Sequence, residues 1–143
     1  MEVGGDLDLA PIGNCAVSAL IDRMGRYVWA CAPRFDSDPV FSSLLSDQDP
    51  GEATTPGAWA VDMIDVATAS QEYLRNTAVL RTELTDNKGG KLEILDFSPR
   101  YPQFGRTYRP TAFIRLIRPL QGAPNIRIRL TPTADWGRQR QTI

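Results

Sequence analysis

The chain has 143 residues, no histidine and a formal net charge of −1, with 42% hydrophobic and 23% charged residues. This length and balance indicate one soluble globular domain and exclude a disordered chain, and no apolar run reaches the roughly 18 residues of a membrane-spanning helix. The absence of histidine excludes Ser-His-Asp and Cys-His catalysis and histidine-ligated metal sites, and two cysteines alone cannot hold a structural zinc, so we expect neither metal nor cofactor.

The N-terminal residues 1–11 carry no periodicity and end in Pro11, which predicts a loosely held arm. Their acidic start lacks the basic and apolar regions of a secretory signal. With no long apolar run elsewhere, these features predict a cytoplasmic protein that does not contact a membrane.

Acidic and basic residues are unevenly distributed along the chain. Residues 1–70 carry 11 acidic and 3 basic side chains, whereas residues 71–143 carry 6 acidic and 13 basic ones. A nucleic-acid surface would gather its arginines and lysines in a loop or on a helix. Here they alternate with aliphatic residues, so we expect the two halves to interleave in one fold, without a nucleic-acid partner.

Period-two alternation over 14–21 and 27–32 predicts a first pair of strands. A turn around Met24-Gly25 joins them, because glycine readily adopts the positive φ that such turns need. This register sets Asp22 opposite Tyr27.

The same register separates the two cysteines, because Cys31 falls opposite Ser18 and Cys15 falls opposite Arg34. A disulfide would need the two cysteines to lie nearly opposite each other. We therefore expect two reduced, mostly buried thiols that pack as small apolar groups.

Pro33 ends the second strand, since proline has no N–H to donate, and a polar loop follows it. Beyond this loop, apolar residues at i, i+1, i+4 and i+5 predict a short helix with one apolar face. Its N-cap is Ser37 or Asp38, and its apolar residues are Val40, Phe41, Leu44 and Leu45.

The remainder of the chain also alternates with period two. Strands are predicted over 58–66, 69–75, 79–85, 91–97, 112–120 and 125–131. The segment 86–90 is a hairpin connection, 98–110 is a loop, and the last two strands form a final pair. In the strand 126–130, strict alternation predicts one buried and one wet face. The fold class is therefore all-β, an antiparallel β-sandwich of about seven to nine strands with one short helix.

Several short motifs follow one another in a characteristic order. The first are Gly13-Asn14, Trp29, Pro33-Arg34-Phe35-Asp36-Ser37 and Phe41 with Leu44-Leu45. The later ones are Gln71-Glu72-Tyr73, Asn76-Thr77-Ala78-Val79-Leu80, Asp96-Phe97-Ser98-Pro99-Arg100, Ile117-Arg118-Pro119-Leu120 and Ala134-Asp135-Trp136-Gly137-Arg138. Together they resemble the N-terminal β-sandwich domain of trehalase-like and glucoamylase-like enzymes of glycoside hydrolase family 15. The chain departs from the family pattern at Trp136, where a tyrosine is common.

The resemblance implies a non-catalytic domain over 12–138, followed by a C-terminal tail over 139–143 that leads to an absent catalytic domain. The two catalytic glutamates of the family belong to a C-terminal (α/α)6 barrel that cleaves α-glucosidic bonds with inversion. No catalytic residue is therefore carried over, and the isolated chain is expected to be inactive. Its implied role is to brace the barrel. The implied substrate-rim or interdomain loop consists of Arg34, Phe35, Asp36 and Ser37.

The residues of this loop support two interpretations without the resemblance. A guanidinium that donates and a carboxylate that accepts can bind sugar hydroxyls, or Arg34 and Asp36 can tie down their own loop. The carboxylates form no convincing acid–base pair. Asp38 is expected to cap the helix, and Asp62 and Asp65 fall on opposite faces of one strand.

The rival interpretation is a free carbohydrate-binding module. The feature in its favour is a set of three tryptophans that could stack on sugar rings of α-glucosides, Trp29, Trp59 and Trp136. Trp29 and Trp136 are the candidate site residues, although tryptophans pack under sheets more often. A weaker rival is a small hydrolase that uses Asp36. Alternating arginines on the last strands form a solvated or ion-paired face, or a docking face that would favour homo-oligomers; they are Arg115, Arg118, Arg127 and Arg129.

Overall fold

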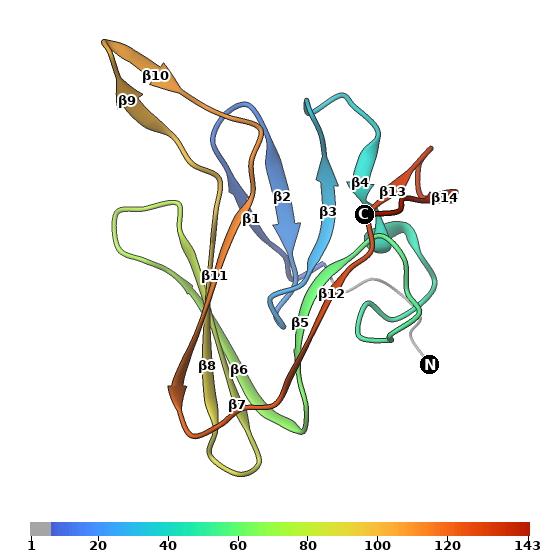
Figure 1. Cartoon of the computed structure of the whole chain (residues 1–143), viewed down its shortest axis with the longest axis vertical. Helices are drawn as coiled ribbons and strands as arrows, with labels where there is room; N and C mark the ends of the chain where they lie inside the picture. The colour runs from blue at the N-terminus through green and yellow to red at the C-terminus, as the bar shows by residue number, and fades with distance from the viewer. Residues whose placement is uncertain (1–6) are drawn as a thin grey trace.

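The protein is described by a computed structural model over residues 7–143. The described residues form two main antiparallel sheets and two small hairpins (Figure 1). The first sheet has the order β1-β2-β3-β5-β12, with β4 also paired to β3. Its strands are β1 (Ala10–Gly13), β2 (Ser18–Ile21), β3 (Tyr27–Cys31), β4 (Pro39–Phe41), β5 (Trp59–Met63) and β12 (Ile126–Leu130).

The second sheet has the order β11-β8-β7-β6. Its strands are β6 (Val66–Tyr73), β7 (Leu80–Asp86), β8 (Lys91–Phe97) and β11 (Ile114–Gln121). The small hairpins pair β9 (Tyr101–Gln103) with β10 (Arg106–Tyr108), and β13 (Thr133–Ala134) with β14 (Gln139–Arg140). The all-β, antiparallel fold class predicted from period-two alternation is thereby confirmed.

The two sheets bury their apolar faces against each other. One cluster packs Val61 and Met63 of β5 against Leu84, Leu92 and Ile94 of the second sheet. A second cluster joins the first four strands to Leu80 of β7. At its centre the buried Tyr27 ring contacts the rings of Phe41, Trp59 and Phe113 at centroid distances of 5.0–5.8 Å. The arrangement is that of a sandwich, in which apolar burial between layers supplies most of the stability.

The first hairpin follows the predicted register for most of its length. Ala19 pairs with Ala30 and Leu20 with Trp29, but an irregularity then places Ile21 opposite Tyr27. The cause is the turn, in which the Asp22 carboxylate accepts hydrogen bonds from the N–H groups of Met24 and Arg26. The connection is therefore one residue longer than expected. β1 starts at Ala10, inside the segment predicted as an arm.

The predicted helix over Val40–Leu45 is wrong. Its first residues form β4, which pairs with β3, and a single 3-10 turn over Ser43–Leu45 follows. The N–H groups of Ser42 and Ser43 both donate to the carbonyl of Gly57, which holds the chain in this path. The i, i+4 apolar spacing fits a strand that ends in a tight turn as well as a helix. Here pairing with β3 decides between them.

The last two strands do not pair with each other. β11 pairs with β8 and β12 pairs with β5, so the connection between them passes from one sheet to the other. In β12 the predicted separation into one buried and one solvent-exposed face does not hold, although Ile126 packs against the core cluster. Arg129 is buried, because residues 49–57 cover it, whereas Ile128 is 58% exposed. Ile128 shares the face of buried Val61, but lies at the open edge of the sandwich where little covers it.

Two further expectations need correction. The predicted loop 98–110 contains the β9–β10 hairpin. Both cysteines are free, as expected, but only Cys31 is buried, whereas Cys15 is exposed. Burial, with a smaller contribution from the charge of Asp38, raises the pKa of the Cys31 thiol above its ordinary value.

Candidate functional site

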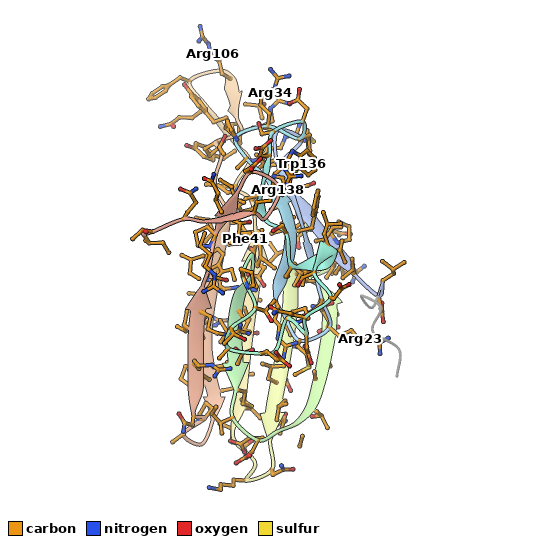
Figure 2. The ribbon with its side chains drawn as sticks, turned by 90° about the vertical axis from the view of Figure 1, so that its right-hand side faces the viewer. Arg23, Arg34, Phe41, Arg106, Trp136 and Arg138 are labelled. Atoms are coloured by element: carbon orange, nitrogen blue, oxygen red, sulfur yellow. The ribbon has the colours of Figure 1, made fainter. Side chains whose placement is uncertain are left out.

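The candidate site lies at the end of the sandwich where the β3–β4 loop and the β9–β10 hairpin emerge together (Figure 1). Figure 2 places Arg34 and Arg106 at this end of the long axis, far from Arg23. A hydrogen bond of 3.4 Å from the Thr111 hydroxyl to the Pro33 carbonyl connects the segment after the hairpin to the start of the loop. The two segments therefore project from the same end of the molecule and are linked at their bases.

The predicted rim loop is internally organised. Arg34 and Asp36 form a forked ion pair, with Nε to Oδ1 at 2.9 Å and Nη2 to Oδ2 at 3.0 Å. The Arg34 N–H donates to Ser37 Oγ at 3.2 Å, and the Ser37 N–H donates back to the Arg34 carbonyl at 3.1 Å. The Phe35 side chain is exposed. The loop therefore has a defined shape, and its charged and aromatic groups remain accessible from solvent.

Asn14 anchors this end of the molecule and is missed as a functional position by reasoning from composition. Its buried amide donates to the carbonyls of Pro99 and Pro110 at 3.0 and 2.8 Å, the two ends of the hairpin segment. Its Oδ1 accepts from the N–H groups of Ala16 and Val17. In the sequence Asn14 stands out only as part of the Gly13-Asn14 motif, which does not indicate this anchoring role.

Two of the three tryptophans considered for sugar stacking, Trp29 and Trp136, contact each other. Trp136 lies in the β13–β14 turn, and its ring centroid is 6.3 Å from that of Trp29 on β3, with the planes tilted by 43°. Trp136 is 54% exposed, whereas Trp29 is half-buried. Trp29 therefore packs on the outside of the first sheet, and the Trp136 indole beside it remains accessible from solvent. The third tryptophan, Trp59, packs against Tyr27 in the core.

A buried ion pair lies between the sheets. Arg115 of β11 and Asp96 of β8 are 1% and 0% exposed, and Nε lies 2.7 Å from Oδ1. Arg115 also donates to the carbonyls of Trp59 and Gly25, and its guanidinium carbon lies 4.6 Å from the Tyr27 ring centroid. The Tyr27 hydroxyl donates to Asp96 at 3.3 Å, and burial followed by the Asp96 charge raises the Tyr27 pKa above its ordinary value. This cluster is a structural connection between layers, in which every charge has a partner.

The other arginines of the alternating series are ion-paired. Arg129 and Arg127 reach Asp62 at 2.7 and 3.3 Å, and Arg118 contacts Glu93. Burial disfavours the charged form of Asp62, but hydrogen bonds and charges from Arg129 and Arg26 outweigh it and hold the Asp62 pKa below its ordinary value. A carboxylate held in this way is a poor general base. All four arginines of the series are therefore ion-paired, but they lie on two different sheets and do not form one face.

Residues 7–143 contain no cluster of three or more histidine, cysteine, aspartate or glutamate side chains arranged to hold a metal ion. In the same range, no helix has the length and apolar character needed to cross a membrane.

Comparison with known proteins shows what the chain resembles. The profile of the family described as "Trehalase-like, N-terminal" matches residues 8–143. The trehalase of Thermoplasma volcanium is 32% identical over 135 residues, which cover 92% of this chain and 20% of that protein. Trehalase 1 and trehalase 2 of Sulfolobus acidocaldarius are 38% and 31% identical over 62% and 65% of this chain, and each match covers 14% of the relative.

These curated relatives are much longer than the matched region. The chain spans a fifth or less of their length, since the matches cover 20%, 14% and 14% of the three proteins. No solved structure matches the chain at a significant level.

Proposed function

We propose that this chain, which belongs to the trehalase-like N-terminal family, is the non-catalytic β-sandwich domain of a glycoside hydrolase of family 15, the trehalase and glucoamylase type. In this proposal it braces an (α/α)6 catalytic barrel that hydrolyses trehalose or another α-glucoside with inversion. The observation that carries the proposal is the match to only a fifth or less of each trehalase, with 92% of this chain aligned to the Thermoplasma protein. The chemistry then belongs to the remaining four-fifths.

Features of the described residues support a non-catalytic role. Two carboxylates with little exposure, Asp62 on β5 and Glu93 on β8, are each paired with arginines. Asp36 and Asp38 share one exposed loop with Arg34. The free thiols of Cys15 and Cys31 fit a reducing compartment, and the proposal includes a cytoplasmic location.

The proposal gives the Arg34–Ser37 loop a place at the rim of the sugar site or at the boundary with the barrel. Its support is the exposed Arg34–Asp36 pair beside exposed Phe35, held in a fixed shape by Ser37. Donor and acceptor groups in one rigid loop suit sugar hydroxyls and polar protein surfaces alike.

The test is a chimera of the Thermoplasma volcanium trehalase in which this chain replaces the matched segment. Trehalose hydrolysis and the half-life of thermal inactivation are measured beside the same enzyme with the segment deleted. We expect the chimera to exceed the deleted enzyme in one or both measurements, while the isolated chain shows no turnover. A chimera that behaves like the deleted enzyme, or turnover by the isolated chain, contradicts the proposal.

A free carbohydrate-binding module is the second candidate, favoured by the exposed Trp136 beside Trp29. Titration of the isolated chain with glucose, trehalose and maltooligosaccharides, followed by tryptophan fluorescence, separates the two. Saturable binding that is lost in Trp136→Ala favours the module. An unchanged signal across the three sugars favours the bracing domain.

A further inference from the structure

The β9–β10 hairpin presents an aromatic side chain at its tip. Gln103 pairs with Arg106, so the connecting turn contains only Phe104 and Gly105, with φ values of +50° and +71°. Two positive values define the type of turn that asparagine or aspartate followed by glycine fills best. Phe104 occupies the asparagine position and is 86% exposed.

This choice of residue does nothing for the domain itself. A bulky side chain rarely adopts positive φ, and an apolar ring in water gains nothing from burial. Local rules are broken in this way mainly where a residue serves a function. Phe104 is therefore better explained by a contact with another protein surface that buries its ring.

The hairpin is also held rigidly enough to act as an arm. The rings of the cross-strand pair Tyr101 and Tyr108 stack at 5.7 Å with an interplanar angle of 16°. The Asn14 amide ties down both ends of the segment through the carbonyls of Pro99 and Pro110. A preorganised arm loses little conformational entropy on binding, which favours association.

The hairpin segment that carries the exposed ring is positively charged. No acidic residue occurs between Asp96 and Asp135, so the whole hairpin segment is basic. The arginines of β11 and β12 in this stretch have carboxylate partners on neighbouring strands. Within residues 7–143, by contrast, no ion pair involves the three arginines of the hairpin segment, Arg100, Arg106 and Arg109. The Arg100 guanidinium donates instead to the Cys15 sulfur at 3.5 Å.

We propose that the β9–β10 hairpin is a docking arm that inserts Phe104 into an apolar pocket ringed by carboxylates on the catalytic region of the same enzyme. This inference rests on the proposed function and names the surface through which the domain acts. The catalytic region is the chosen partner because at least four-fifths of the length of each of the three relatives lies outside the match. An aromatic anchor flanked by arginines is the residue set that dominates binding energy at protein interfaces, and arginine pairs with carboxylates in a forked geometry.

The test uses the chimera described above with three variants. Phe104→Asn removes the anchor and supplies the residue that the turn prefers. Arg106→Glu reverses one hairpin charge. Lys88→Glu is the matched control, because Lys88 is exposed in the β7–β8 turn at the opposite end of the sandwich (Figure 1).

We expect Phe104→Asn and Arg106→Glu each to shorten the inactivation half-life of the chimera by about tenfold, the loss of one hot-spot contact. Lys88→Glu should leave the half-life within about twofold, the usual result of a surface substitution. The unfolding midpoint of the isolated Phe104→Asn chain should be unchanged or higher, which separates lost docking from lost folding.

If the Phe104→Asn and Arg106→Glu chimeras match the parent chimera, the docking arm is overturned while the bracing function stands. If the chimera is no better than the deleted enzyme, the bracing function fails and the arm fails with it. If sedimentation shows that the isolated chain dimerises and that Phe104→Asn abolishes the dimer, the pocket belongs to a second copy and the catalytic partner is overturned.

Discussion

Two arginine–aspartate pairs with nearly the same geometry occupy opposite surroundings in this domain. The Nε–Oδ1 distance is 2.7 Å for Arg115–Asp96 and 2.9 Å for Arg34–Asp36. The first pair is 1% and 0% exposed between the sheets, and the second is 76% and 71% exposed in the β3–β4 loop. Inside the sandwich each charge depends on its partner, whereas in the loop water can replace either one. The buried Arg115–Asp96 pair is therefore structural. The exposed Arg34–Asp36 pair remains available for contacts with another molecule.

The largest expected effect comes from breaking the buried pair. Asp96→Ala leaves the Arg115 guanidinium between the sheets without a countercharge, and removing one partner of such a pair costs about 3–5 kcal/mol. Urea unfolding followed by tryptophan fluorescence measures the loss. A decrease below about 1 kcal/mol, the range of surface pairs, would show that the two pairs are equivalent.

Acid should weaken the Asp62 cluster next. Arginine contacts hold the Asp62 pKa in the folded chain below the ordinary value of 3.8, despite opposition from burial. A lowered folded-state pKa stabilises the fold above the unfolded-state value, and this stability is lost as the pH falls toward the folded-state value. We expect the unfolding free energy to decline below about pH 4, and Asp62→Asn to flatten the decline. An identical pH profile for wild type and Asp62→Asn contradicts the assignment.

A smaller effect is expected for Tyr27→Phe, which removes the hydroxyl that donates to Asp96 at 3.3 Å and keeps the ring under Arg115. One lost hydrogen bond is worth about 1 kcal/mol. Differential scanning calorimetry of the two proteins checks it. The Arg115 contacts to Asp96 remain in Tyr27→Phe. A decrease in stability as large as that of Asp96→Ala would therefore mean that the Tyr27 hydroxyl, and not the Arg115 guanidinium, stabilises the Asp96 carboxylate.

The smallest effect on folding is expected in the exposed pair. Arg34→Ala and Asp36→Ala should each change the unfolding free energy by less than about 1 kcal/mol, because both side chains are largely solvated. The matched comparison is Asp96→Ala under the same urea conditions. A loss of several kcal/mol at Asp36 would assign the loop a structural role and remove the contrast between the two pairs.

Local signals predicted the fold where turn chemistry and alternation agreed. The strand 91–97 was predicted with the bounds of β8, since the segment 86–90 supplies a turn in which Gly89 takes a φ of +84°. Alternation could not show that Arg129 is buried under residues 49–57, or that Ile128 stays exposed on the face that meets the core. Pairing between distant strands decides that question, and the partners of β11 and β12 lie outside the reach of local pattern.

The site was predictable only in part. The Arg34–Ser37 loop was located from its proline and polar composition, and its ion pair agrees with one of the two interpretations of the residues. The β9–β10 hairpin was missed because the proline, glycine and tyrosine content of the segment 98–110 is typical of a loop. The anchoring role of Asn14 depends on carbonyls 85 and 96 residues away, a separation that no local rule covers.

The pairing of β12 with β5 has a consequence for the order in which the domain can be made. Ile126 to Leu130 are the partners of Met63 to Trp59, so β5 stays unpaired on this side until a strand near the end of the chain is available. During synthesis, β5 leaves the ribosome more than 60 residues before its neighbour and exposes an unpaired edge in the meantime. Closure of the sandwich is therefore a late, non-local step, and such steps slow folding in β proteins. A nascent chain halted before residue 126 would carry an incomplete sheet open to association with other chains.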